Sequence, residues 1–165
     1  MAPMKVWTVV ESPIGPLRVV GGGEGVTAIE FSPFDEEAQV GERNDEAPLL
    51  VEAARQLRAY FAGELTDFDL PLAPRGTDYQ HRVWAALREV PYGRTATYAE
   101  IAAALGQPRG ASRAVGSANG RNPIPVVVPC HRIVGADGSL TGYAGGLERK
   151  QVLLDLERSE EDLLF

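Results

Sequence analysis

Short runs rich in β-branched and apolar residues alternate with turn residues over the first 31 positions of the chain. The runs are Lys5–Glu11, Leu17–Gly21 and Val26–Phe31. The segment Ser12–Pro16 separates the first two runs, and the glycines at 21–23 separate the second from the third. Strand-forming runs bounded by Gly and Pro are typical of hairpins. The pattern therefore predicts a meander of three antiparallel strands.

The hydrophobic period changes after the meander. The polar stretch Asp35–Asn44 predicts a loop or a short helix. Over Ala47–Phe61 the apolar positions follow the period of a helix with one buried face. They are Leu50, Ala53, Ala54, Leu57 and Phe61. The stretch Asp67–Leu72 is compatible with one more strand.

Two prolines and a glycine mark a boundary near the middle of the chain. They are Pro71, Pro74 and Gly76. A chain of 165 residues, 44% of them hydrophobic, can form one ordinary domain or two small ones. The boundary predicts an N-terminal domain of residues 1–74 and a C-terminal domain of residues 75–165.

Two capping boxes open helices in the second half. Thr77 with Gln80 forms the first, and Thr97 with Glu100 forms the second, ahead of a helix over Tyr98–Leu105. The first helix has Tyr79, Val83, Leu87 and Val90 at helical spacing, and it ends at Pro91-Tyr92-Gly93.

A third helix is predicted over Ala111–Asn119, after Gly106 and Pro108 close the second one. A helix, a short Gly/Pro turn and another helix form the outline of a helix-turn-helix. Because the same outline also occurs as a plain packing motif, the pattern alone leaves both interpretations open.

The region that follows is rich in proline. Three prolines in Asn122–Arg132 disfavour both a helix and a central strand. This segment is therefore predicted to be stiff and extended. A turn signal at 136–138 predicts a hairpin or wing over Ile133–Tyr143, and a last helix is expected over Glu148–Leu156.

The composition indicates in which cellular compartment the protein is expected. The chain has one cysteine, so it can form no internal disulfide, which fits a reducing compartment. The N-terminus shows no signal peptide, and the longest apolar run, Ile124–Cys130, is far too short to span a bilayer. We expect a soluble, cytoplasmic protein with no membrane partner.

Charge is distributed unevenly. The formal net charge is −7, which alone argues against a nucleic-acid partner. Residues 1–74 carry −8 and residues 136–165 carry −4, whereas residues 75–135 carry +5. All eight basic residues of that middle segment are arginines, whose fork suits phosphate oxygens. The middle segment is a candidate DNA-binding surface, although chance variation on a solvated surface would give a similar imbalance.

Cys130 is the strongest candidate for chemistry. A lone cysteine is more often a small buried hydrophobe than a nucleophile. Here, however, it lies in a proline-flanked segment and is followed by His131 and Arg132. A cationic neighbourhood lowers the pKa of a thiol, and a Cys–His pair oriented by a carboxylate is a common way to activate one. These features favour a nucleophile, although neighbours in an extended strand point apart.

Three motifs surround this cysteine. They are Gly120-Arg121-Asn122-Pro123, Pro129-Cys130-His131-Arg132 and Gly142-Tyr143-Ala144-Gly145-Gly146. With the upstream helix-turn-helix, they strongly resemble the O6-alkylguanine-DNA alkyltransferases, in detail over about residues 77–158 and more loosely through the N-terminal part. The resemblance implies an α+β fold: a small, ribonuclease H-like antiparallel-sheet domain packed on a helical winged helix-turn-helix domain.

The resemblance also implies catalytic roles. Cys130 corresponds to the acceptor thiolate, and His131 to the base that activates it through a water. Glu157 corresponds to the carboxylate that orients the histidine, although by itself it looks like a solvated charge at a helix end. Asn122 corresponds to the brace between recognition helix and active-site loop, and Tyr98 to the hydrogen-bond donor to a flipped guanine.

Further residues are implied to bind DNA and the base. Arg113 corresponds to the arginine finger that fills the space left by the extruded nucleotide. The implied DNA-binding surface also includes Thr97, Ala114, Gly116, Ser117 and Arg121. The implied base pocket is formed by Val128, Pro129, Tyr143 and Ala144. Ala144 departs from relatives that have serine there, which removes one hydroxyl near O6.

The function implied is direct repair of O6-alkylguanine in double-stranded DNA. After base flipping, the alkyl group moves irreversibly to Cys130, so that one molecule repairs one lesion. No cofactor or metal is expected, and a monomer is expected. Three alternatives remain: a non-catalytic lesion binder of the same fold, a helix-turn-helix transcription regulator, and a cysteine hydrolase.

Overall fold

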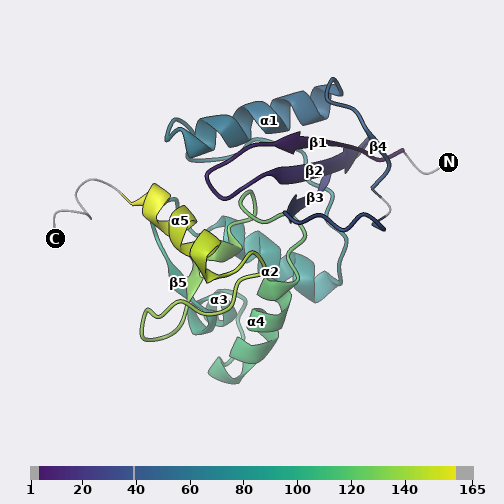
Figure 1. Cartoon of the computed structure of the whole chain (residues 1–165). Helices are drawn as coiled ribbons and strands as arrows, with labels where there is room; N and C mark the ends of the chain where they lie inside the picture. Colours follow the sequence, from purple (N-terminus) through teal and green to yellow (C-terminus); the bar gives the residue numbers. More distant parts are fainter. Residues whose placement is uncertain (1–3, 39, 159–165) are drawn as a thin grey trace. The chain divides into compact units, whose positions relative to one another are not determined.

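The chain forms two compact units, Met1–Arg75 and Gly76–Phe165, in a computed structural model that describes residues 4–38 and 40–158 (Figure 1). The first unit combines a four-stranded sheet with one helix, and the second is mainly helical. Among the described residues, no helix is long and apolar enough to cross a membrane.

The sheet of the N-terminal unit has the strand order β3-β2-β1-β4. β1 (Val6–Val10), β2 (Leu17–Gly22) and β3 (Gly25–Phe31) are antiparallel neighbours, which confirms the predicted meander. β4 (Glu42–Arg43) pairs in parallel with β1 and falls in the stretch expected to be a loop or short helix. Both of its residues are exposed, so no buried side chain marks it in the sequence.

α1 (Pro48–Phe61) packs against β1 and β2 and covers one face of the sheet (Figure 1). The predicted helix is confirmed, and its buried stripe includes Leu50 and Leu57, both fully buried. Tyr60 is also fully buried, whereas Phe61, expected on the stripe, is only half-buried. The core of this unit therefore lies between the helix and the sheet.

The strand proposed for Asp67–Leu72 does not form. Only an isolated bridge joins Val26 to Leu72. The Gln56 side chain binds both backbone groups of Asp69, accepting from its N–H at 2.8 Å and donating to its carbonyl at 2.9 Å. These bonds to a helix side chain take the place of a strand partner, and Pro71 has no N–H to offer.

Three helices begin the C-terminal unit. They are α2 (Asp78–Arg88), α3 (Tyr98–Ala104) and α4 (Ser112–Gly120). Both predicted capping boxes form, each with its two reciprocal hydrogen bonds. The Trp84 indole N–H donates to the carbonyl of Ala118 at 2.9 Å and joins α2 to α4. α3 and α4 are thus the two helices of the predicted helix-turn-helix.

The segment Asn122–Arg132 was expected to be extended, and this expectation is wrong. It folds into buried turns and ends in a short 3-10 helix, η2 (Cys130–Arg132). The Asn122 side chain donates to the carbonyl of Val128 at 2.8 Å and accepts from the N–H of Ile124 at 3.0 Å. An asparagine that binds its own backbone in this way favours a turn over a strand. Val126 adopts a left-handed conformation, with φ of 73°.

The hairpin expected over Ile133–Tyr143 is also absent. β6 (Ile133–Val134) pairs in parallel with β5 (Ala96–Thr97), just before α3. Because β5 takes up the strand pairing of β6, the following residues close a turn instead, in which the N–H of Gly135 donates to the carbonyl of Ser139 at 2.9 Å. The last helix, α5 (Leu147–Glu157), confirms the prediction over Glu148–Leu156.

Candidate active site

Cys130 opens η2 and has a free, buried thiol with 4% of the residue exposed. Burial raises the pKa of this thiol to about 11, although a hydrogen bond with Asn122, the charge of Lys150 and a hydrogen bond with Tyr143 act in the opposite direction. The sequence suggested that the adjacent cations would lower this pKa. In the structure the thiol is neutral near pH 7, so it needs a base in order to react.

The residues next to Cys130 are joined to a carboxylate from α5. Glu157 Oε2 lies 2.7 Å from His131 Nε2, and Glu157 Oε1 accepts from Arg132 Nε at 2.8 Å. Arg132 makes two more bonds, from Nη2 to Glu157 Oε2 at 3.0 Å and from Nη1 to the carbonyl of Val90 at 2.8 Å. All three charged or polar side chains are buried. Arg132, the cation near Cys130 in sequence, is thus paired with Glu157.

Electrostatics fix the protonation of this cluster. Burial raises the pKa of Glu157, but hydrogen bonds from His131 and Arg132 outweigh burial and lower it to about 2. Burial lowers the pKa of His131 and outweighs the opposing effect of Glu157. A neutral imidazole beside a carboxylate carries its proton on Nε2, which leaves the lone pair on Nδ1. Within the described residues Nδ1 has no hydrogen-bond partner. The nitrogen that can accept a proton is therefore the one left unbonded.

Lys150 is a part of the site that sequence reasoning missed. Lys150 lies in α5 and is fully buried. Its Nζ donates to the carbonyls of Ile133 at 2.6 Å and Thr141 at 3.1 Å. Burial lowers its pKa, and electrostatic interaction with Cys130 acts in the opposite direction. In the sequence it resembles any polar residue on a helix, so no local signal distinguishes it. A buried cation is costly to desolvate, and here it joins β6, which directly follows the thiol segment, to the loop that carries Thr141.

Tyr98 begins α3, and its hydroxyl lies 2.5 Å from the Thr141 hydroxyl. A methyl group built on Gly116 of α4 would be 3.6 Å from Cε1 of Tyr98, so this helix passes close to the ring. Tyr143 is half-buried and acts on the Cys130 thiol through a hydrogen bond. Ala144 is exposed, whereas Val128 and Pro129 are buried within the folded loop before Cys130.

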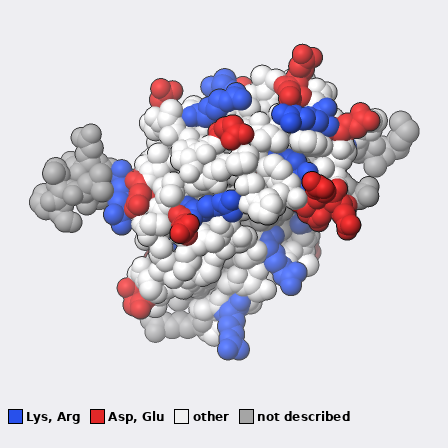
Figure 2. Space-filling view, in the orientation of Figure 1, with Lys and Arg blue, Asp and Glu red and all other residues white. Residues whose placement is uncertain are grey.

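Three of the four predicted DNA-binding residues of α4 are exposed on one face, and the fourth, Gly116, is half-buried. Arg113, Ala114 and Ser117 are exposed, whereas Val115, Ala118 and Asn119 on the other side are buried. Arg121, just after the helix, is exposed as well. In Figure 2, blue side chains stand out in the region where Figure 1 draws α4. Thr97 is half-buried, and its hydroxyl caps α3 by accepting from Glu100 N–H at 3.1 Å.

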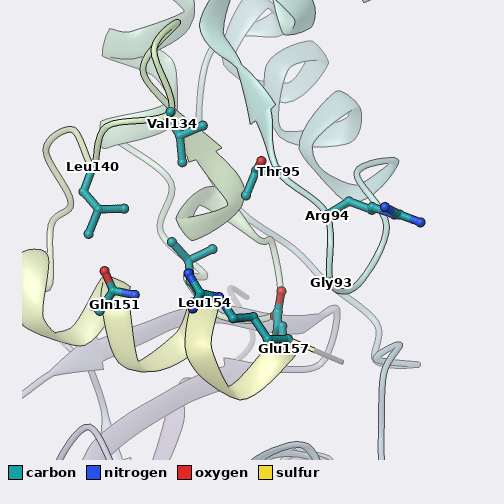
Figure 3. A pocket seen from close by; sticks show the side chains of 10 residues that line it. Gly93, Arg94, Thr95, Val134, Leu140, Gln151, Leu154 and Glu157 are labelled. Atoms are coloured by element: carbon teal, nitrogen blue, oxygen red, sulfur yellow. The ribbon is translucent and has the colours of Figure 1, made fainter. Parts of the chain in front are cut away.

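A surface pocket of about 410 Å³ approaches Glu157 from a side that does not include Cys130 (Figure 3). Its walls include Thr95, Val134 and Leu154, and the side chain of Arg94 points away from it (Figure 3). Because Cys130 does not line this pocket, it is not the binding site for the reacting group. Across residues 4–38 and 40–158, no group of three or more His, Cys, Asp or Glu side chains is placed to hold a metal ion.

Comparison with known proteins supports the family resemblance. Residues 78–159 match the family described as 6-O-methylguanine DNA methyltransferase, DNA binding domain. Residues 5–74 match the ribonuclease-like domain of the same enzyme family. The fold is thus α+β, with a ribonuclease-like N-terminal domain and a DNA-binding C-terminal domain.

Similar proteins cover nearly the whole chain. A methylated-DNA–protein-cysteine methyltransferase of Methanosarcina acetivorans is 53% identical over 156 residues, which is 93% of this chain and 98% of that protein. One from Mycobacterium tuberculosis is 51% identical over 150 residues, 91% of this chain and 90% of that protein.

Solved structures agree with these relatives. The crystal structure of the M. tuberculosis O6-methylguanine methyltransferase has a TM-score of 0.85 and 48% identity and covers 98% of both chains. The structure of M. tuberculosis OGT in complex with DNA has a TM-score of 0.84 and 46% identity and covers 97% of this chain and 99% of the other. On these matches, and on the cluster built around Cys130, the chain belongs to the 6-O-methylguanine DNA methyltransferase family.

Proposed function

We propose that this protein repairs DNA directly, by moving the alkyl group of O6-alkylguanine onto Sγ of Cys130. The observation that carries this proposal is a lone buried thiol followed directly in the chain by a neutral imidazole, whose Nδ1 has no hydrogen-bond partner among the described residues. Both relatives named above are methylated-DNA–protein-cysteine methyltransferases.

The thiol loses its proton as it reacts rather than beforehand. With a pKa of about 11, Cys130 is almost entirely protonated at neutral pH. His131 accepts the proton at Nδ1, directly or through a water, and Glu157 stabilises the imidazolium that forms. The sulfur then bonds to the alkyl carbon, the bond from that carbon to O6 breaks, and the electron pair remains on guanine. A proton from the Tyr98 hydroxyl neutralises the purine.

The partner in this proposal is double-stranded DNA that contains O6-alkylguanine. The exposed face of α4 offers Arg113 with Ala114 and Ser117 beside it, and Arg121 follows. Small side chains allow a helix to approach a narrow groove, and arginines bind phosphate. The relative solved in complex with DNA supports this partner. Arg113 takes the place of the extruded nucleotide, since an alkyl carbon inside the stack is out of reach.

The reaction consumes the protein. Its product is a thioether, which offers water no good leaving group, and the sequence has no second cysteine for an exchange reaction. We propose that a monomer acts once on one lesion, and that it works in the cytoplasm, where its thiol stays reduced.

Intact-protein mass spectrometry tests this proposal. The protein is mixed with a short duplex that carries one O6-methylguanine, and with the same duplex carrying guanine. We expect a gain of one methylene at Cys130 that saturates at one equivalent and is absent with the control duplex.

The Cys130→Ala variant should bind the lesion duplex without any gain in mass. Turnover beyond one equivalent would point to a hydrolase. Binding by the wild type without a gain in mass would point to a lesion binder or a transcription regulator. Either outcome would overturn the proposal.

A further inference from the structure

The phenol of Tyr98 already has a partner within the protein. Its oxygen lies 2.5 Å from Thr141 Oγ1, and either hydroxyl can donate in this pair. The two residues are far apart in sequence, since Tyr98 opens α3 and Thr141 lies in the loop before α5. Both side chains are partly buried. The contact is therefore part of the packed structure and not a chance encounter of two exposed side chains.

Thr141 is itself held in place by a buried charge. Lys150 Nζ donates to the Thr141 carbonyl at 3.1 Å and to the Ile133 carbonyl at 2.6 Å. Ile133 belongs to β6, immediately after Cys130–Arg132. A charged donor makes stronger hydrogen bonds than a neutral one. The backbone of Thr141 is thus anchored to the segment that carries the thiol, and its hydroxyl is aimed at Tyr98.

We propose that Thr141 is a positioning residue for the transfer reaction: its hydroxyl donates to the Tyr98 oxygen, so that the Tyr98 proton points to the purine. This inference rests on the proposed function, in which Tyr98 gives its proton to guanine. A phenol has one proton, so Tyr98 can donate to the purine only if Thr141 becomes the donor within the pair.

The proton balance of this step is simple. The bond from sulfur to the alkyl carbon forms, the bond from that carbon to O6 breaks, and guanine keeps the electron pair. The Tyr98 proton passes to guanine. Thr141 keeps its own proton and donates a hydrogen bond to the negative oxygen left on Tyr98. Because a hydrogen bond to a charged acceptor is stronger than one to a neutral acceptor, the Thr141 bond strengthens as the reaction proceeds.

Thr141→Val tests the inference, because valine keeps the shape and the backbone carbonyl that Lys150 binds but removes the hydroxyl. We expect the single-turnover rate of methyl transfer from saturating lesion duplex to fall about tenfold. Duplex affinity should be unchanged. Thr141→Ser should restore most of the rate, and Thr66→Val, the same change at an exposed threonine of the N-terminal unit, should have no effect.

Two further measurements separate positioning from damage to the site. The rate at which iodoacetamide alkylates Cys130 should be unchanged in Thr141→Val, because that reaction does not use Tyr98. In a Tyr98→Phe background, Thr141→Val should cause no further loss, since the two hydroxyls act as one unit.

The outcomes distinguish this inference from the proposed function. Absence of methyl transfer in the wild type would overturn both. A slow Tyr98→Phe variant beside a Thr141→Val variant as fast as the wild type would overturn the role of Thr141 alone. A faster Thr141→Val variant would show that the hydroxyl competes with the purine for Tyr98, which is the opposite of the inference.

Discussion

Each unit of the molecule contains a buried arginine that is paired with a glutamate, and only the pair in the C-terminal unit belongs to the candidate active site. In the N-terminal unit Arg18 on β2 faces Glu30 on β3 across the sheet. In the C-terminal unit Arg132 binds Glu157. Both arginine side chains are 7% exposed, but Glu30 is 30% exposed whereas Glu157 is 2% exposed.

The two arginines share two further kinds of contact, one with a backbone carbonyl and one with an aromatic ring. Arg18 also donates to the carbonyl of Asp35 at 3.1 Å, and Arg132 to that of Val90 at 2.8 Å. The Arg18 Cζ atom lies 5.5 Å from the centre of the Trp7 ring, and that of Arg132 lies 5.7 Å from the centre of the Tyr92 ring. The two glutamates, however, differ in what else they contact. Glu157 also binds His131, whereas water can reach Glu30.

The largest expected difference between the pairs is in activity. Glu157→Gln keeps the size of the side chain but removes the charge that stabilises an imidazolium at His131. We expect the rate of methyl transfer from lesion duplex to fall by at least about a hundredfold. Glu30→Gln should leave the rate unchanged. Equal rates for the Glu157 variant and the wild type, measured in single turnover, would remove His131 from its role as base.

The second difference is in stability. Arg132→Met removes the permanently charged partner of a carboxylate that cannot reach water, and we expect the free energy of unfolding to fall by about 3–5 kcal/mol. Arg18→Met leaves a partly solvated Glu30, so the loss should be about 1 kcal/mol. Urea denaturation measures both. A similar loss in the two variants would show that exposure of the glutamate does not control the strength of the pair.

Only part of the structure could be predicted from the sequence. The capping boxes at Thr77 and Thr97 could be predicted, because both partners of each box lie within four residues of each other. The roles of Cys130, His131 and Glu157 followed from family motifs, and the structure brings the last two into contact at 2.7 Å. Their roles in the reaction stay predictions.

The features that the sequence did not give depend on contacts between distant segments. Prolines suggested an extended chain before Cys130, but Asn122 folds it by binding backbone groups on both sides of a turn. Lys150 and Thr141 carry no local signal, because each takes its place from a carbonyl or hydroxyl on another element. The raised pKa of the thiol likewise comes from burial, which a charged neighbour in sequence does not reveal.

The two arginine–glutamate pairs should also differ in how the stability of the protein depends on acid pH. The folded-state pKa of Glu157 is about 2, below its ordinary value of 4.5. As pH falls below 4.5 the unfolded chain binds a proton at this residue before the folded protein does. Stability contributed by Glu157 is therefore full above pH 4.5 and is lost as the pH falls towards 2, by about 3 kcal/mol in all. In Glu157→Gln this part of the acid dependence of urea unfolding should be missing, whereas Glu30→Gln should retain it.

The smallest expected effect concerns the aromatic rings. Phe34 lies with its ring centre 5.1 Å from Cζ of Arg18. Phe34→Leu removes this cation–π contact, but it also removes apolar area, so one variant cannot isolate the contact. A double-mutant cycle with Arg18→Met cancels the area, and we expect a coupling energy of about 0.5–1 kcal/mol from urea unfolding. Methyl transfer should stay at the wild-type rate in all four proteins of the cycle. A coupling energy near zero would mean that Phe34 does not help to hold the N-terminal arginine, whose remaining partners are then its carboxylate, its carbonyl and the Trp7 ring.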